Sequence, residues 1–93
     1  MDRVALIRER LTQALAPAQL DIIDDSHQHA GHAAAGGASH FTVKIVSAQF
    51  TNQTPLERHR MVYRAVADLM PTQIHALSIT ALTPEEQSSP LQA

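Results

Sequence analysis

Histidine is the residue type in this chain that could do metal chemistry, since its 93 residues include six histidines and no cysteine. A neutral imidazole is a common metal ligand, and it titrates close to neutral pH. Without thiolates, the chain cannot form a disulfide, a zinc ribbon, a cysteine nucleophile or an iron–sulfur cluster held by its own residues alone. The composition therefore allows a shared metal site and excludes an autonomous thiolate site.

Three histidines follow each other closely in a long stretch rich in glycine and alanine. His27, His29 and His32 have the spacing H-x-H-x-x-H, which could form a zinc or copper site. Three such histidines without a carboxylate or thiol are a weak signal, although Asp24 and Asp25 lie close by in the sequence. The alternative is a set of solvated polar residues in a connecting loop.

His75 is the other candidate ligand, at the start of a predicted strand. It has the same parity as Leu77 and Ile79, so it is either a half-buried histidine that closes the strand end with one hydrogen bond or a ligand at the edge of the sheet. His40 is expected to fix the start of its strand, and His59 to pack at the start of a helix.

Three arginines in two helical turns form the second candidate site. Arg58, Arg60 and Arg64 could contact phosphates of double-stranded DNA. The alternative is a solvated face in which Arg60 pairs with Glu57 and Arg64 with Asp68. The formal net charge of −2 argues against general coating of nucleic acid. The sequence contains no Ser/His/Asp arrangement, catalytic carboxylate pair or phosphate-binding glycine loop, so we expect no enzyme.

The elements that must position these residues follow an α-β-β-α-β-α order, which predicts a single small α+β domain. Apolar periodicity, with the capping boxes Thr54–Glu57 and Thr83–Glu86 at two helix starts, predicts helices over 3–15, 55–70 and from residue 84, and strands over 20–23, 40–47 and 74–82. Helices should cover one face of a three-stranded sheet. The second helix is expected to bury four apolar residues: Leu56, Val62, Val66 and Leu69.

Three stretches together resemble the BolA family: HQHAGHAAAGGASHFTVKIVS, PLERHRMVYRAV and IHALSITALTPEE. Their order, spacing and context agree, and with the first helix the resemblance covers nearly the whole chain. It implies a fold related to the type II KH domain. Residues 1–87 would form the BolA-like domain, and 88–93 a frayed tail. No GxxG clamp occurs, which argues against the usual RNA-binding mode of KH domains.

The resemblance also implies a function. It suggests a non-catalytic adaptor that pairs with a monothiol glutaredoxin and shares a glutathione-ligated [2Fe–2S] cluster, for iron–sulfur trafficking or for sensing of iron and redox state. Carried over by position, the ligands from this chain are His75 and His32, with His29 and His27 as alternatives to His32. We expect no cofactor in the isolated protein.

Bacterial members of the family imply an alternative function, that of a DNA-binding transcriptional regulator of stress response and cell morphology. Arg58, Arg60 and Arg64 would then contact DNA. The sequence departs from the family pattern in the loop after Phe50, where glycine often stands in place of Asn52-Gln53, and at Gln87, where tryptophan is common. No apolar run is long enough for a membrane span, so a cytoplasmic location is expected. The sequence leaves open whether the free protein forms a weak homodimer.

Overall fold

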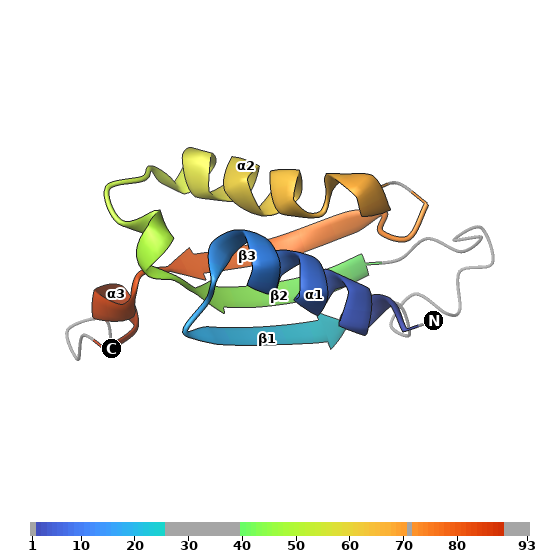
Figure 1. The fold of residues 1–93 in the computed structure, drawn as a ribbon, viewed down its shortest axis with the longest axis horizontal. Helices are drawn as coiled ribbons and strands as arrows, with labels where there is room; N and C mark the ends of the chain where they lie inside the picture. Colours follow the sequence, from blue (N-terminus) through green and yellow to red (C-terminus); the bar gives the residue numbers. More distant parts are fainter. Residues whose placement is uncertain (1, 26–39, 71, 89–93) are drawn as a thin grey trace.

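A computed structural model describes residues 2–25, 40–70 and 72–88 (Figure 1). In chain order its elements are α1 (Arg3–Leu15), β1 (Gln19–Asp24), β2 (His40–Val46), η3 (Ala48–Phe50), α2 (Pro55–Ala65), η4 (Ala67–Leu69), β3 (Ala76–Leu82) and α3 (Pro84–Ser88), where η denotes a 3₁₀ turn. The predicted α-β-β-α-β-α order and the α+β class are confirmed. None of the helices in the described ranges is long and apolar enough to cross a membrane.

The sheet is mixed, with β2 in the middle. β1 pairs with β2 in antiparallel register, and β2 pairs with β3 in parallel register. Two parallel neighbours need a crossover connection, which the segment from η3 through α2 to η4 supplies. As a result, the first residues of β2 and β3 and the last residue of β1 lie at the same end of the sheet.

The core lies between the sheet and the two long helices. Alternation along β2 puts Phe41, Val43 and Ile45 on one face, where all three are fully buried. The remaining core residues come mostly from α1, α2 and the segment around β3: Ile7, Leu11, Leu15, Phe50, Val62, Val66, Leu69, Ile74 and Leu77. Helices α1 and α2 lie alongside each other over this face (Figure 1), as the pattern predicted.

Helix α2 begins as the sequence indicates and ends earlier. Thr54 Oγ1 accepts a hydrogen bond from Glu57 N–H (3.1 Å), and Pro55 occupies the first turn. The helix stops at Ala65 instead of continuing to residue 70, because the backbone at Val66 (φ −109°, ψ 16°) leaves helical geometry. The 3₁₀ turn η4 then completes the connection.

The predicted burial of Leu56 is wrong, since Leu56 is 61% exposed. The buried stripe of α2 passes through Val62, and four residues before Val62 it reaches position 58. Arg58 therefore points inward, and Leu56 lies off the stripe. The position of a residue around the helix, and not its apolar character, decides whether its side chain faces the core, so the exposed side of α2 carries a leucine.

Candidate functional site

Three polar residues lie at the end of the sheet where β2 and β3 begin. His40 is opposite Ala76 in the parallel register, so His75 immediately precedes the paired part of β3. Asp25 follows β1, and its N–H donates to the carbonyl oxygen of His40 (2.8 Å). We call Asp25, His40 and His75 the histidine edge.

His75 is the exposed member of the histidine edge. Its side chain is open to solvent, and within the described part of the chain it makes no hydrogen bond or ion pair. The predicted third strand begins at Ala76 instead of residue 74, because Ile74 is fully buried and donates its N–H to the Leu69 carbonyl oxygen (3.1 Å). Of the two sequence interpretations of His75, the half-buried histidine that closes the strand end with one hydrogen bond is wrong, because the side chain is exposed and makes no such bond among the described residues.

His40 is engaged with its neighbours. Its Nε2 lies 3.2 Å from Ser78 Oγ, and the ring is half-buried. The hydroxyl of Thr42 donates to a carboxylate oxygen of Asp25 on the adjacent strand end. These contacts tie β1, β2 and β3 together, which agrees with the predicted role of His40 in fixing the start of its strand.

The loop histidines His27, His29 and His32 lie outside the described residues. The segment that carries them leaves the described structure after Asp25 and returns at His40, so both of its ends are at the histidine edge. Within residues 2–25, 40–70 and 72–88, no group of three His, Cys, Asp or Glu side chains could hold a metal ion. Of this part of the chain, His75 fits the role of a single donor to a site completed by other groups.

Arg58 forms a dense set of contacts at the opposite end of β3. Its guanidinium donates to both carboxylate oxygens of Glu86 (2.7 and 3.2 Å) and to the carbonyl oxygens of Gln53 (2.9 Å) and Ala81 (3.0 Å). It also lies over the ring of Phe50, with 5.9 Å from Cζ to the centroid. We call Arg58, Glu86, Gln53 and Ala81 the arginine clasp.

Glu86 is held from two sides. The hydrogen bonds from Arg58, and next that from the backbone N–H of Thr83 (2.8 Å), lower the pKa of the Glu86 carboxyl to about 2. Glu86 N–H in turn bonds Thr83 Oγ1 (3.2 Å), so Thr83 and Glu86 form the predicted reciprocal capping box of α3. The arginine clasp therefore fastens α3 to α2 and β3.

Arg60 and Arg64 remain open to solvent. Their side chains are 61% and 70% exposed, and both approach Glu57, at 3.9 and 3.8 Å. The predicted Arg60–Glu57 pair is confirmed. The predicted Arg64–Asp68 pair is wrong, because α2 ends at Ala65 and Asp68 instead pairs with Arg10 (2.8 Å).

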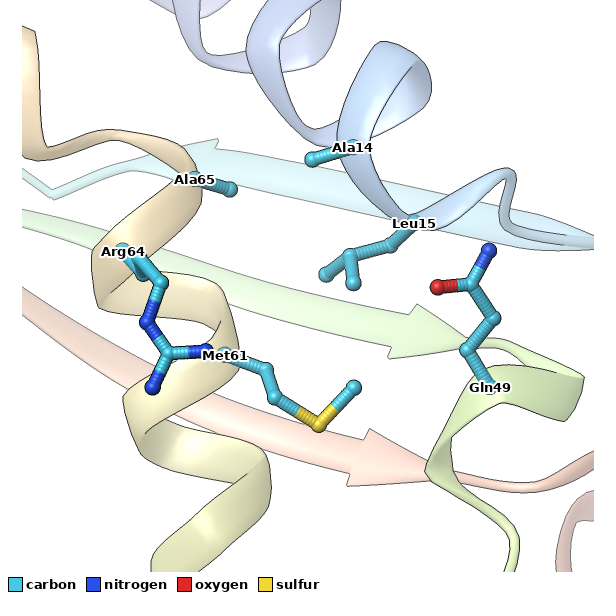
Figure 2. Close-up of a pocket in the computed structure, with 6 residues that line it drawn as sticks. All are labelled: Ala14, Leu15, Gln49, Met61, Arg64 and Ala65. Carbon is cyan, nitrogen blue, oxygen red and sulfur yellow. The ribbon is translucent and has the colours of Figure 1, made fainter.

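Arg64 also borders a shallow hollow of about 320 Å³ between α1, η3 and α2. The hollow is lined by Ala14, Leu15, Gln49, Met61, Arg64 and Ala65. Figure 2 shows Met61 and Leu15 directed across it from opposite helices, with Arg64 on one side and the Gln49 amide on the other. Its lining is mostly apolar, with one cationic side chain.

Two contacts of the site were missed by sequence reasoning. The Arg58–Glu86 pair joins residues 28 positions apart, and a hydroxyl of Tyr63 reaches the backbone of Leu77, 14 positions away. The inward position of Arg58 on the stripe of Val62 was a usable signal for the first contact. Nothing in the pattern pointed to the second.

Comparison with known proteins gives concordant matches. The family model described as BolA-like protein matches residues 11–86. The chain is 44% identical over 92 residues to "Protein BOLA1, chloroplastic" of Arabidopsis thaliana. The aligned residues cover 95% of this chain and 58% of that protein. It is 40% identical over 80 residues to "DNA-binding transcriptional regulator BolA" of Escherichia coli (strain K12), covering 86% of this chain and 74% of the relative.

A solved structure shares the fold. The BolA domain of SufE1 from Arabidopsis thaliana superimposes with a TM-score of 0.81 at 42% identity, over 92% of this chain and 96% of that one. The agreement extends over helices and sheet together, so the architecture and the sequence likeness point to the same family.

Proposed function

This chain belongs to the BolA-like protein family, and from that premise we propose that it is a non-catalytic adaptor that pairs with a monothiol glutaredoxin and shares a glutathione-ligated [2Fe–2S] cluster. His75 would supply one ligand. His32 would supply the second, with His29 and His27 as alternatives. The chain spans 58% of the length of the Arabidopsis relative, and the proposal concerns the BolA-like domain itself.

The observation that carries the proposal is the state of His75. Its imidazole is exposed and free of hydrogen bonds within the described residues, and it stands at the same end of the sheet as both ends of the segment with the loop histidines. An unengaged imidazole can donate a nitrogen to iron without first losing another partner. By contrast, His40 is engaged with Ser78.

The absence of cysteine supports a shared cluster. Histidine can replace thiolate on an iron of a [2Fe–2S] cluster, and this replacement raises the reduction potential. Two histidines leave the cluster half ligated, so the thiolates must come from the glutaredoxin cysteine and from glutathione. The bound cluster would supply a one-electron redox centre or an iron–sulfur unit for transfer.

The test is reconstitution of the cluster from this protein, a monothiol glutaredoxin and glutathione, followed by visible circular dichroism. We expect His75→Ala to change the spectrum and to speed loss of the cluster to a chelator by roughly tenfold or more. His59→Ala is the matched control, because His59 is also exposed but lies on α2. Identical spectra for wild type and His75→Ala would contradict the assignment.

A second function, DNA binding in transcriptional regulation, is favoured by the exposed Arg60 and Arg64 on α2 and by the likeness to the Escherichia coli regulator. Arg58 was part of the predicted DNA contact, but its guanidinium is engaged in the arginine clasp. In this mode Arg60→Ala with Arg64→Ala weakens retention on double-stranded DNA and reduces its salt dependence. Unchanged retention would contradict it.

A further inference from the structure

The hydroxyl of Tyr63 connects α2 to the strand that follows His75. Leu77 N–H donates to Tyr63 Oη (3.3 Å), and the Tyr63 O–H donates to the carbonyl oxygen of Leu77 (3.2 Å). Because β3 lies at the edge of the sheet that the described residues form, the outward backbone groups of this strand have no neighbouring strand there to pair with. One phenol therefore satisfies both polar backbone groups of Leu77.

The residue on the other side of His75 is also anchored. Ile74 is fully buried, and its N–H donates to the Leu69 carbonyl oxygen at the end of η4 (3.1 Å). His75 thus lies one residue after a buried anchor and two residues before the Tyr63 contact. Its side chain touches no hydrogen-bonding partner among the described residues, so the direction of its Cα–Cβ bond depends on these two backbone anchors.

We propose that Tyr63 is a positioning residue for His75, holding the start of β3 so that the imidazole is presented in a fixed direction to the cluster. The inference rests on the proposed function of His75 as a ligand. Metal-bound histidines usually gain orientation from a hydrogen bond on the second ring nitrogen. His75 has no such hydrogen bond among the described residues, and the Ile74 and Leu77 anchors orient its backbone instead.

A purely structural role for Tyr63 is the competing explanation, since its ring packs against the core. Tyr63→Phe separates the two, because it keeps the ring and removes only the hydroxyl. The matched control is Ser47→Ala, which removes another hydroxyl that donates to a backbone carbonyl oxygen, that of Leu15 (2.7 Å), at the far end of β2.

The experiment compares wild type, Tyr63→Phe, Ser47→Ala and His75→Ala in two measurements. The first is amide hydrogen exchange at Leu77 in the free protein, which reports the contact independently of any cluster. The second is visible circular dichroism and the rate of cluster loss to a chelator in the complex with glutaredoxin and glutathione. We expect Tyr63→Phe to speed amide exchange at Leu77. In the complex, the same variant should speed cluster loss roughly tenfold and change the circular dichroism spectrum. Ser47→Ala should leave the amide exchange at Leu77 and the cluster unchanged.

The outcomes distinguish the two proposals. If His75→Ala alters the cluster and Tyr63→Phe does not, the positioning role is overturned and the ligand role stands. If His75→Ala leaves the cluster unchanged, the ligand role and the positioning role both fail. Equal effects of Ser47→Ala and Tyr63→Phe on the cluster would also overturn the positioning role, because general loosening of the fold would then explain both.

Discussion

At the end of β3, the guanidinium of Arg58 donates to Glu86 and to two backbone carbonyl oxygens, and its side chain is only 12% exposed. At the start of the same strand, the imidazole of His75 is exposed and has no such partner in the described part of the chain. Both residues were candidates for binding an external group. A satisfied, nearly buried polar group stabilises the fold, whereas an unsatisfied exposed group on an anchored backbone is available to a ligand.

The comparison predicts a large loss of stability for one alanine variant and almost none for the other. Arg58→Ala removes one of the two donors to the Glu86 carboxylate and the guanidinium donor to two carbonyl oxygens, so we expect the free energy of unfolding to fall by about 2 kcal/mol. Within the described part of the chain, His75→Ala removes no hydrogen bond or ion pair of the side chain, so we expect a change within about 0.5 kcal/mol. Urea denaturation of both variants measures these values.

A control for charge alone is Arg60→Ala, in the same helix. Arg60 is exposed, and its ion pair with Glu57 among the described residues is long (3.9 Å), so we expect Arg60→Ala to behave like His75→Ala in denaturation. If Arg60→Ala destabilised the protein as much as Arg58→Ala, the contrast between the two ends would reflect helix charge instead of the arginine clasp.

The second prediction concerns pH and the arginine clasp. The pKa of Glu86 is lowered from 4.5 to about 2 in the folded protein, so its ionised form contributes stability above the unfolded value. That contribution is lost as the pH falls from about 4.5 toward 2. We expect the stability of the wild type to fall more than that of Glu86→Gln over this range. Asp68, whose pKa is lowered by Arg10, titrates in both proteins and cancels in the comparison.

Parallel pH curves for wild type and Glu86→Gln would contradict this account. The measurement is chemical denaturation at a series of pH values between about 6 and 2.

The third prediction has the smallest effect and tests which side chain of α2 points inward. Leu56→Ala should change the free energy of unfolding by no more than about 0.5 kcal/mol, because Leu56 is exposed. Leu69→Ala, the same truncation at a buried site, is the positive control and should lower the denaturation midpoint clearly. A large loss with Leu56→Ala would place it in the core and remove the reason for the inward position of Arg58.

Local signals in the sequence predicted most of the fold. Thr54 and Thr83 both act as helix caps as expected, and alternation along β2 places Phe41 and Val43 in the core. Contacts between distant residues escaped prediction. Glu86 was expected only to cap its own helix, yet its carboxylate also accepts hydrogen bonds from Arg58. Asp68 pairs with Arg10 of α1, which no local pattern indicated. Periodicity describes one element at a time, so it does not say which elements meet.

For the candidate site, the sequence indicated His75 through the resemblance to the BolA family. Only the structure shows that the His75 side chain is exposed and that the backbone on both sides of it is anchored. The contact between Tyr63 and Leu77 depends on the closeness of α2 to the edge of β3, which no local pattern expresses. The assignment of His32, His29 or His27 stays a prediction, because these residues lie outside the described ranges.

The most direct test of the central claim is pulsed electron paramagnetic resonance of the reduced, shared cluster, prepared with this protein labelled with ¹⁵N in histidine only. Ligation by His75 predicts strong hyperfine coupling to ¹⁵N, with one coupling lost in His75→Ala and retained in His59→Ala. Absence of ¹⁵N coupling from this chain, or an unchanged spectrum in His75→Ala, would contradict the claim that His75 binds the cluster.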